Sequence, residues 1–143
     1  MPEGPESPFQ HFNITADFGL VAQGRDLKEA FANVAYGMLS LLIDPEEVRR
    51  ERSYPLEVKA SDRESLLVAW LNEILYLFDT EGFLARDFSI LELDEGHLKA
   101  EVWGEPIDPD RHHFKGYVKA ATYHQLEVKE GEGGWQVRVV FDV

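Results

Sequence analysis

The sequence contains no cysteine, which excludes disulfide bridges, thiolate metal sites and cysteine nucleophiles. It is also short of cations, with 14 lysine and arginine residues against 27 aspartate and glutamate residues and a formal net charge of −13. Direct binding to RNA or DNA is therefore unfavourable, because phosphate contacts need clustered lysine and arginine. Anionic membranes are disfavoured for the same reason. A protein partner of basic or mixed charge, or a cation, suits this composition better.

Long apolar runs are missing as well. No segment approaches the roughly 20 apolar residues of a membrane-spanning helix. Residues 1–8 contain glutamate and proline but no apolar run, so they do not resemble a secretory signal peptide. The sequence therefore predicts a soluble, cytoplasmic protein. Its 143 residues, 44% hydrophobic, suffice for one packed core, and we expect a flexible leader over 1–8 and a single domain over 9–143.

Motifs of catalysis are mostly absent. The sequence has no phosphate-binding loop of the Gly-x-x-x-x-Gly-Lys kind, and none of its few serines lies in a nucleophile elbow. The glycine-rich stretch Gly131–Gly134 lacks a lysine and contains Glu132, which would repel phosphate. We interpret this stretch as a turn between two strands.

Two segments have the pattern of amphipathic helices. Asp26 precedes Glu29 at the spacing of a capping box, and apolar residues then recur at helical spacing as far as Leu42. A second helix is expected to begin near Ser61, with Glu64 at the corresponding position of another capping box. An apolar stripe follows it as well, so both helices should bury one face.

Segments with a period of two are typical of strands. They are Phe9–Thr15, Gly19–Gln23, Tyr54–Ala60, Phe88–Leu93, Leu98–Gly104, Lys115–Val128 and Trp135–Phe141. Glu105–His113 is interpreted as a polar loop. Two helices among antiparallel strands predict an α+β fold, in which a single domain packs a mainly antiparallel sheet against two amphipathic helices.

His112 and His113 are adjacent and follow Asp108 and Asp110, so a metal site is conceivable there. However, neighbouring side chains on an extended segment point to opposite sides and rarely bind one ion. We therefore favour a solvated loop over a metal site.

Two aspartates lie near the ends of expected strands. Asp17 precedes Phe18 and most simply caps a turn. Asp142 follows the last expected strand, and Val143 adds a terminal carboxylate. If Asp17 folds next to Asp142, three carboxylates meet, and a hard cation such as Ca²⁺ or Mg²⁺ would relieve their repulsion. The sequence alone leaves open whether they meet.

Lys119 and His124 lie within the long strand expected over Lys115–Val128. A lysine inside a strand is most often at an edge or faces solvent, and His124 is most simply a half-buried, hydrogen-bonded side chain. In regular alternation the two residues face opposite sides, so their joint action would require a β-bulge.

Four segments, in order along the chain, together resemble the archease family. They are Asn13–Gly19 with the helix after it, Leu66–Tyr76, Val118–His124 and Trp135–Val143. The likeness covers nearly the whole chain from about Phe9 onward. One departure lies at Ile14, because the family usually has a histidine directly before its Thr-Ala-Asp motif. His11 lies three residues earlier, and whether it substitutes is left open.

The resemblance implies an activator and not an enzyme. Proteins of this family act with a tRNA-splicing RNA ligase of the RtcB type, promote guanylylation of its histidine and its multiple turnover, and broaden its use of nucleotides. It further implies a divalent cation, expected to be Ca²⁺ with Mg²⁺ or Mn²⁺ as alternatives, held by Asp17, Asp142 and Val143. The other positions to which it assigns a role in partner interaction are Thr15, Lys119 and His124.

Two other functions stay open on the sequence. A stand-alone metal-dependent phosphohydrolase would use Asp17, His124 and Asp142, but the sequence lacks a dense metal-ligand motif. A chaperone-like binding module would need exposed apolar patches, of which the amphipathic stripes give no sign.

Overall fold

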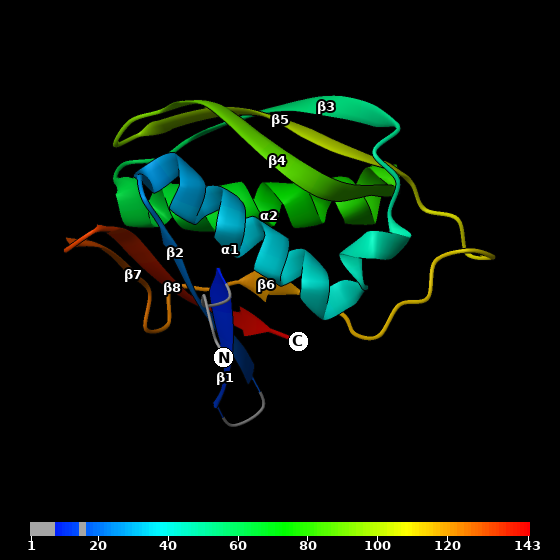
Figure 1. The fold of residues 1–143 in the computed structure, drawn as a ribbon, viewed down its shortest axis with the longest axis horizontal. Coiled ribbons are helices and arrows are strands. Elements are labelled where there is room, and N and C mark those ends of the chain that lie inside the picture. Colours follow the sequence, from blue (N-terminus) through cyan, green and yellow to red (C-terminus); the bar gives the residue numbers. More distant parts are fainter. Residues whose placement is uncertain (1–7, 15–16) are drawn as a thin grey trace.

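Two antiparallel sheets enclose the two helices in the computed structural model, which describes residues 8–14 and 17–143 (Figure 1). The first sheet contains β1 (Phe9–Ile14), β2 (Asp17–Gly24) and β8 (Gly134–Asp142), and the outer edge of β8 pairs with both β6 (Ala120–Ala121) and β7 (Glu127–Gly131). The second sheet contains β3 (Arg52–Lys59), β5 (His97–Pro106) and β4 (Phe83–Leu93), in that order. The helices are α1 (Leu27–Leu42) and α2 (Arg63–Glu81), and a short 3₁₀ helix, η1 (Pro45–Glu47), follows α1. The α+β fold predicted from the sequence is confirmed.

Both helices begin at an aspartate. The carboxylate of Asp26 accepts a hydrogen bond from the backbone N–H of Glu29 at 2.8 Å, as the sequence predicts. The second helix begins one residue later than expected, because Asp62 and not Ser61 is its cap and accepts from the backbone N–H of Ser65 at 2.8 Å. The predicted box of α2 is therefore wrong by one residue.

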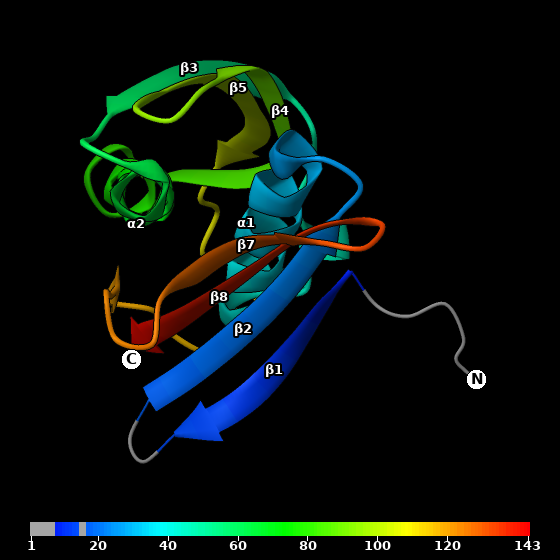
Figure 2. The same cartoon turned by 90° about the vertical axis from the view of Figure 1, so that its left-hand side faces the viewer.

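The helices are buried on two sides, because each packs against both sheets. Figure 2 shows the β3–β5–β4 sheet on one side of them and the β1–β2–β8 sheet on the other. The indole N–H of Trp70 on α2 donates to the backbone carbonyl of Phe31 on α1 at 3.0 Å, and both side chains are fully buried. Enclosure on two sides explains why α2 buries residues on more than one face, Val68 and Leu77 among them. Within the described residues, no helix is both long and apolar enough to cross a membrane.

The long strand expected over Lys115–Val128 is wrong. The two residues of β6 pair with β8, and the chain then leaves this edge of β8 in a turn. It rejoins the same edge as β7. Gln125 lies in this turn at φ 52°, a left-handed conformation that is incompatible with an extended strand at this position. The stretch Gly131–Gly134 forms the expected turn between β7 and β8, with Gly133 at φ 82°.

Residues 107–119, which we call the strap, cross from the end of β5 to β6, and the first part of the strap binds a buried carboxylate of β5. Glu105 is 2% exposed and accepts from the backbone N–H of Arg49 at 2.7 Å. It also accepts from the guanidinium of Arg111 and from Nε2 of His112, the latter at 2.9 Å. Because Nδ1 of His112 accepts from the backbone N–H of Asp108 at 2.9 Å, the partners assign the proton to Nε2.

The polar loop predicted over Glu105–His113 is therefore wrong for Glu105, and the solvated position predicted for His112 is wrong as well. Glu105 belongs to β5, and the side chain of His112 is fully buried against it. A buried carboxylate requires hydrogen-bond donors, and the strap folds back to supply them. His113 points elsewhere: it is exposed, and its Nδ1 lies 3.1 Å from the carboxylate of Glu47. The expectation that neighbouring histidines point apart is confirmed.

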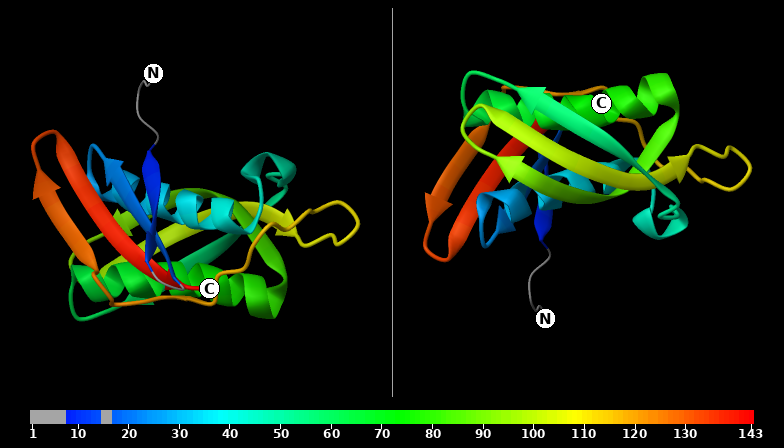
Figure 3. Two further views of the ribbon diagram at one scale, coloured as in Figure 1. Left: turned by 90° about the horizontal axis from the view of Figure 1, so that it is seen from below. Right: turned by 90° about the horizontal axis from the view of Figure 1, so that it is seen from above.

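The remainder of the strap is fixed mainly through its backbone. The N–H of Lys115 donates to the carbonyl of Leu42, at the end of α1, at 2.8 Å. The side chain of Val118 is buried, and the N–H of Lys119 donates to the carbonyl of Asp142 at 2.8 Å. Figure 3 shows the strap returning from the protruding end of β5 to the C-terminal end of β8.

We predict that Glu105→Gln lowers stability at neutral pH and weakens its dependence on acid. Burial by itself raises the pKa of Glu105, but the hydrogen bonds from Arg111, the backbone of Arg49 and His112 outweigh it and lower the pKa from 4.5 to about 2. The ionised carboxylate therefore stabilises the fold above pH 4.5, and this contribution is lost as the pH falls from 4.5 to about 2. Breaking the buried pair should lower the free energy of unfolding by about 3 kcal/mol at pH 7.

Urea unfolding at a series of pH values measures both effects. The matched control is Glu130→Gln on β7, where the side chain is exposed and the change should stay within about 0.5 kcal/mol. If Glu105→Gln loses stability between pH 4.5 and 2 as steeply as the wild type, the assignment of the acid sensitivity to this carboxylate is wrong.

Candidate functional site

Asp17 and Asp142, which we call the acidic pair, are brought together by the pairing of β2 with β8. Asp17 begins β2, Asp142 ends β8, and the antiparallel register places the two residues directly opposite each other. Residues in such positions point to the same face, with Cα atoms about 4.5–5.5 Å apart. Their chain neighbours Phe18 and Phe141 are also paired, and Phe141 is fully buried on the helix side. The acidic pair therefore faces away from the helices.

The acidic pair is electrostatically unfavourable on its own. Like charges directly opposite each other destabilise a sheet, and none of the ion pairs between described residues involves Asp17 or Asp142. A cation between the carboxylates would offset this repulsion. The described part of the chain holds no cluster of three or more His, Asp or Glu side chains suited to a metal. Main-chain oxygens, such as that of Val143, water or groups of a partner can supply further ligands.

The strand on the other side of β8 brings Lys119 to the same end of the sheet. β6 pairs Ala120 with Asp142, and the N–H of Lys119 donates to the carbonyl of Asp142 at 2.8 Å. Lys119 itself is exposed. Asp142 thus lies between Asp17 on β2 and the start of β6, at one end of three adjacent strands.

Asn72 of α2 holds β6 in this position, a role that sequence reasoning missed. Its side-chain oxygen accepts from the backbone N–H of Ala121 at 2.8 Å, and its side-chain nitrogen donates to the carbonyl of the same residue at 3.3 Å. The amide thus takes the place of a neighbouring strand along β6. The one signal in the sequence is a polar residue directly after Leu71 in the apolar stripe of the helix.

His124 and Thr15 are not shown beside the acidic pair. His124 is exposed in the turn after β6, so the half-buried side chain expected there is wrong. Its backbone N–H donates to the hydroxyl of Thr122 at 3.2 Å, and its ring lies 3.4 Å from the amide nitrogen of Gln125. Thr15 lies outside the described residues. The roles assigned to both by resemblance remain predictions.

The register of β1 answers the question raised by Ile14. Ile14 lies directly opposite Asp17, so a histidine at this position would be adjacent to the acidic pair. His11 pairs with Leu20, which is fully buried on the helix side, and therefore belongs to the other face of the sheet. Its ring lies edge-on to Phe18 at 5.9 Å between centroids. By this register, His11 does not lie beside the acidic pair.

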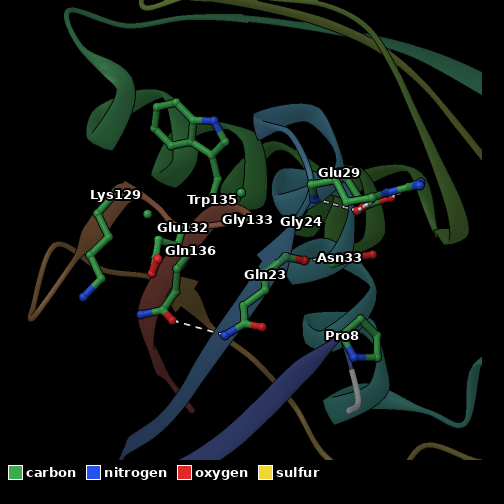
Figure 4. A pocket seen from close by; sticks show the side chains of 13 residues that line it. Pro8, Gln23, Gly24, Glu29, Asn33, Lys129, Glu132, Gly133, Trp135 and Gln136 are labelled. Atoms are coloured by element: carbon green, nitrogen blue, oxygen red, sulfur yellow. Dashed lines mark hydrogen bonds and ion pairs between the residues drawn. The ribbon is translucent and has the colours of Figure 1, made fainter. Parts of the chain in front are cut away.

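A separate open pocket of about 470 Å³ lies at the other end of β2 and β8. Figure 4 shows Gln23 and Gln136 joined across it by a hydrogen bond of 3.3 Å, with Trp135, Lys129 and Glu132 around them. Lys129 and Glu132 bring opposite charges to its rim, which does not favour phosphate. The interpretation of Gly131–Gly134 as a turn agrees with this geometry.

Comparisons with known proteins agree with the resemblance in sequence. The sequence model of the archease protein family matches residues 9–143. An archease of Methanosarcina mazei is 37% identical over 139 residues, covering 94% of this chain and 95% of the relative. An archease of Pyrococcus abyssi is 35% identical over 139 residues, covering 94% of this chain and 98% of the relative.

Solved structures support the fold. The solution structure of a protein of Methanobacterium thermoautotrophicum matches with a TM-score of 0.81 at 36% identity, covering 96% of this chain and 100% of that one. The crystal structure of an archease of Thermotoga maritima, described as a possible chaperone, matches with a TM-score of 0.61 at 19% identity, covering 92% and 94%. The second likeness concerns the fold alone.

We predict that Asn72→Ala releases β6 from α2. The backbone N–H and carbonyl of Ala121 lose their partners, which should cost about 1–3 kcal/mol and accelerate hydrogen exchange at the Ala121 amide. Amide exchange followed by NMR measures the effect. Asn33→Ala, which removes a 2.7 Å side-chain bond to the carbonyl of Gln23, is the control and should leave Ala121 protected. Unchanged exchange at Ala121 in the Asn72 variant would contradict the assigned role.

Proposed function

This chain belongs to the archease family, and on that premise we propose that it activates a tRNA-splicing RNA ligase of the RtcB type. It acts in the cytoplasm as a cofactor protein. It promotes guanylylation of the ligase's own histidine, which allows multiple turnover, and it broadens the nucleoside triphosphates that the ligase uses. The observation that carries the proposal is the register of β2 with β8, which pairs the two aspartates of the family pattern, Asp17 and Asp142.

The acidic pair suits a hard divalent cation, which prefers carboxylate and main-chain oxygens. Asp17, Asp142 and a main-chain oxygen of Val143 would hold it, with Ca²⁺ as the expected ion and Mg²⁺ or Mn²⁺ as alternatives. When bound, such a cation neutralises phosphate charge in nucleotidyl transfer. The paired strands β2 and β8 hold the two aspartates in a fixed arrangement. The protein can therefore position a cation in the ligase active site without contacting RNA.

The charge of the chain supports a protein that binds the ligase and does not bind RNA. A net charge of −13 disfavours unaided binding to RNA, whereas acidic side chains placed at one end of a sheet can approach a metal-bearing site. Lys119 is exposed directly beside Asp142, where it can contact the ligase. Thr15 and His124 are assigned to partner interaction by the family pattern.

A stand-alone phosphohydrolase using Asp17, His124 and Asp142 has less support. The hydrogen bonds of His124 recorded between described residues go to its own turn, through Thr122 and Gln125. A general base that serves the acidic pair would have to reach it. Incubation of the isolated protein with phosphoesters and Mg²⁺ or Mn²⁺ tests this alternative, since turnover without a ligase would favour it.

We expect Asp17→Asn and Asp142→Asn each to reduce the stimulation of ligase guanylylation by about tenfold or more, equivalent to ~1.4 kcal/mol or more of transition-state stabilisation. Single-turnover guanylylation of the ligase, with and without each variant, is the measurement. Asp79→Asn on the exposed end of α2 makes the same change of charge elsewhere and should retain full stimulation. Full stimulation by both acidic-pair variants would rule out the mechanism.

We also expect Ca²⁺ to raise the melting temperature of the wild-type protein, because a ligand that binds only the folded state stabilises it by mass action. The double variant Asp17→Asn with Asp142→Asn should melt higher than the wild type without Ca²⁺, since the like-charge repulsion is gone, and should not respond to Ca²⁺. Calorimetry over a Ca²⁺ series, with Asp79→Asn as control, measures both. An equal response in wild type and double variant would place the cation elsewhere.

A further inference from the structure

Residues 111–126, which we call the acid-free stretch, differ in charge from the rest of the chain. They contain no aspartate or glutamate, although the whole chain has 27 in 143 residues. They include Lys115 and Lys119 and three of the six large apolar side chains that are exposed in the described part of the chain. Those three are Phe114, Tyr117 and Tyr123.

The acid-free stretch borders a pocket of about 350 Å³ beside the C-terminal end of β8. Phe18, Leu41 and Tyr117 contribute apolar surface, Lys115 contributes a cation, and none of the side chains lining the pocket is a carboxylate. Val143, which follows directly after Asp142, also lines it. The pocket thus lies at the same end of β8 as the acidic pair, on the helix side of the sheet to which His11 and Phe18 belong, and its size lies within the range of about 300–1,000 Å³ that is usual for binding pockets.

The pocket is held in shape by the backbone. The N–H of Lys115 is bonded to the carbonyl of Leu42, and Gly116 approaches α1 so closely that a Cβ atom would lie 2.5 Å from the carbonyl oxygen of Leu41. Only glycine allows the strap to pass here. Tyr117 is 53% exposed beside these fixed residues, so little ordering is required for a partner to bind.

We propose that this pocket and Tyr117 form the docking surface for the RNA ligase, which inserts an apolar or aromatic side chain beside a carboxylate that pairs with Lys115. The inference rests on the proposed function and names the surface whose binding to the ligase would place the acidic pair at the ligase active site. Exposed tyrosines in fixed surroundings are typical of the residues that dominate protein interfaces. The acid-free stretch accepts an acidic segment that the rest of this chain repels, which fixes the orientation of docking.

A protein segment fits this surface better than RNA does. Single-stranded RNA binds through stacking together with a groove of cations that follows its phosphates. Here the backbone N–H of Lys119 is bonded to the carbonyl of Asp142, so phosphates that follow the strap from Lys115 to Lys119 would approach the acidic pair. One carboxylate opposite Lys115, with an apolar side chain in the pocket, does not have to extend to Lys119 and Asp142.

Docking and stimulation are separable in one titration. The protein is added at increasing concentration to a fixed amount of ligase, and the guanylylation rate gives a half-saturating concentration and a maximal stimulation. We expect Tyr117→Ala and Lys115→Glu each to raise the half-saturating concentration by about tenfold or more (equivalent to ~1.4 kcal/mol) while retaining the maximum. Asp142→Asn should lower the maximum and leave the half-saturating concentration within about twofold.

Matched controls lie on the other sheet. Leu91→Ala removes an exposed apolar side chain from β4, 52% exposed, and Lys99→Glu reverses an exposed charge on β5. Both should behave as the wild type. Because Tyr117 and Lys115 are exposed, their variants should keep the melting temperature of the wild type, which shows that the fold is retained.

The results separate the two proposals. Unchanged half-saturation by Tyr117→Ala and Lys115→Glu overturns the docking surface and leaves the proposed function intact. If the wild type gives no stimulation, the proposed function fails, and the binding of fluorescently labelled wild type and variants to the ligase still tests the docking surface. If Tyr117→Ala weakens binding of a labelled single-stranded RNA to the isolated protein but leaves ligase binding unchanged, the surface binds RNA and the docking proposal is wrong.

Discussion

The pairing of β2 with β8 is the constraint on which the rest of the structure depends. β8 accepts β2 along one edge and both β6 and β7 along the other, so residues from both ends of the chain meet on one strand. Because β2 and β8 are antiparallel, the start of one lies beside the end of the other, and Asp17 faces Asp142. Gly19 on β2 leaves room for the ring of Phe12 on β1, since a Cβ atom at Gly19 would lie 2.1 Å from that ring. A shift of β8 by one residue relative to β2 would turn Asp142 toward the helices while Asp17 kept its face.

The fold treats its carboxylates in two different ways. Glu105 is buried and satisfied from within, by Arg111, by His112 and by a backbone N–H, so it fixes the strap and needs no ligand. The acidic pair lies at the surface end of the sheet, and no ion pair between described residues involves it. Like charges held opposite each other by backbone pairing gain from an external cation. The strap connects the two sites, since Arg111 and His112 bind Glu105 and Lys119 binds the backbone of Asp142.

Local patterns predicted most of the elements, because capping and periodicity are properties of short segments. Asp26 with Glu29 located the start of α1, and alternation located β3, β5 and β8 within a few residues. The same alternation failed over Lys115–Val128, because a strand exists only where another backbone pairs with it. In that segment Leu42, Asp142 and the side chain of Asn72 take up hydrogen bonds that a neighbouring strand would have used. His112 was mistaken for a solvated residue because its partner Glu105 comes from a strand that looked like the start of a loop.

The sequence by itself determined the acidic charge, the absence of thiol chemistry, the two capped helices and the family, since composition and ordered motifs survive without coordinates. It also supplied the two aspartates as candidates, but not their meeting. Only the tertiary structure decided that Asp17 lies opposite Asp142, that His11 faces the other side of the sheet and that His112 is buried. Each of these depends on strand register or on contact between distant segments, and a single amino-acid sequence carries no direct record of which backbone lies beside which.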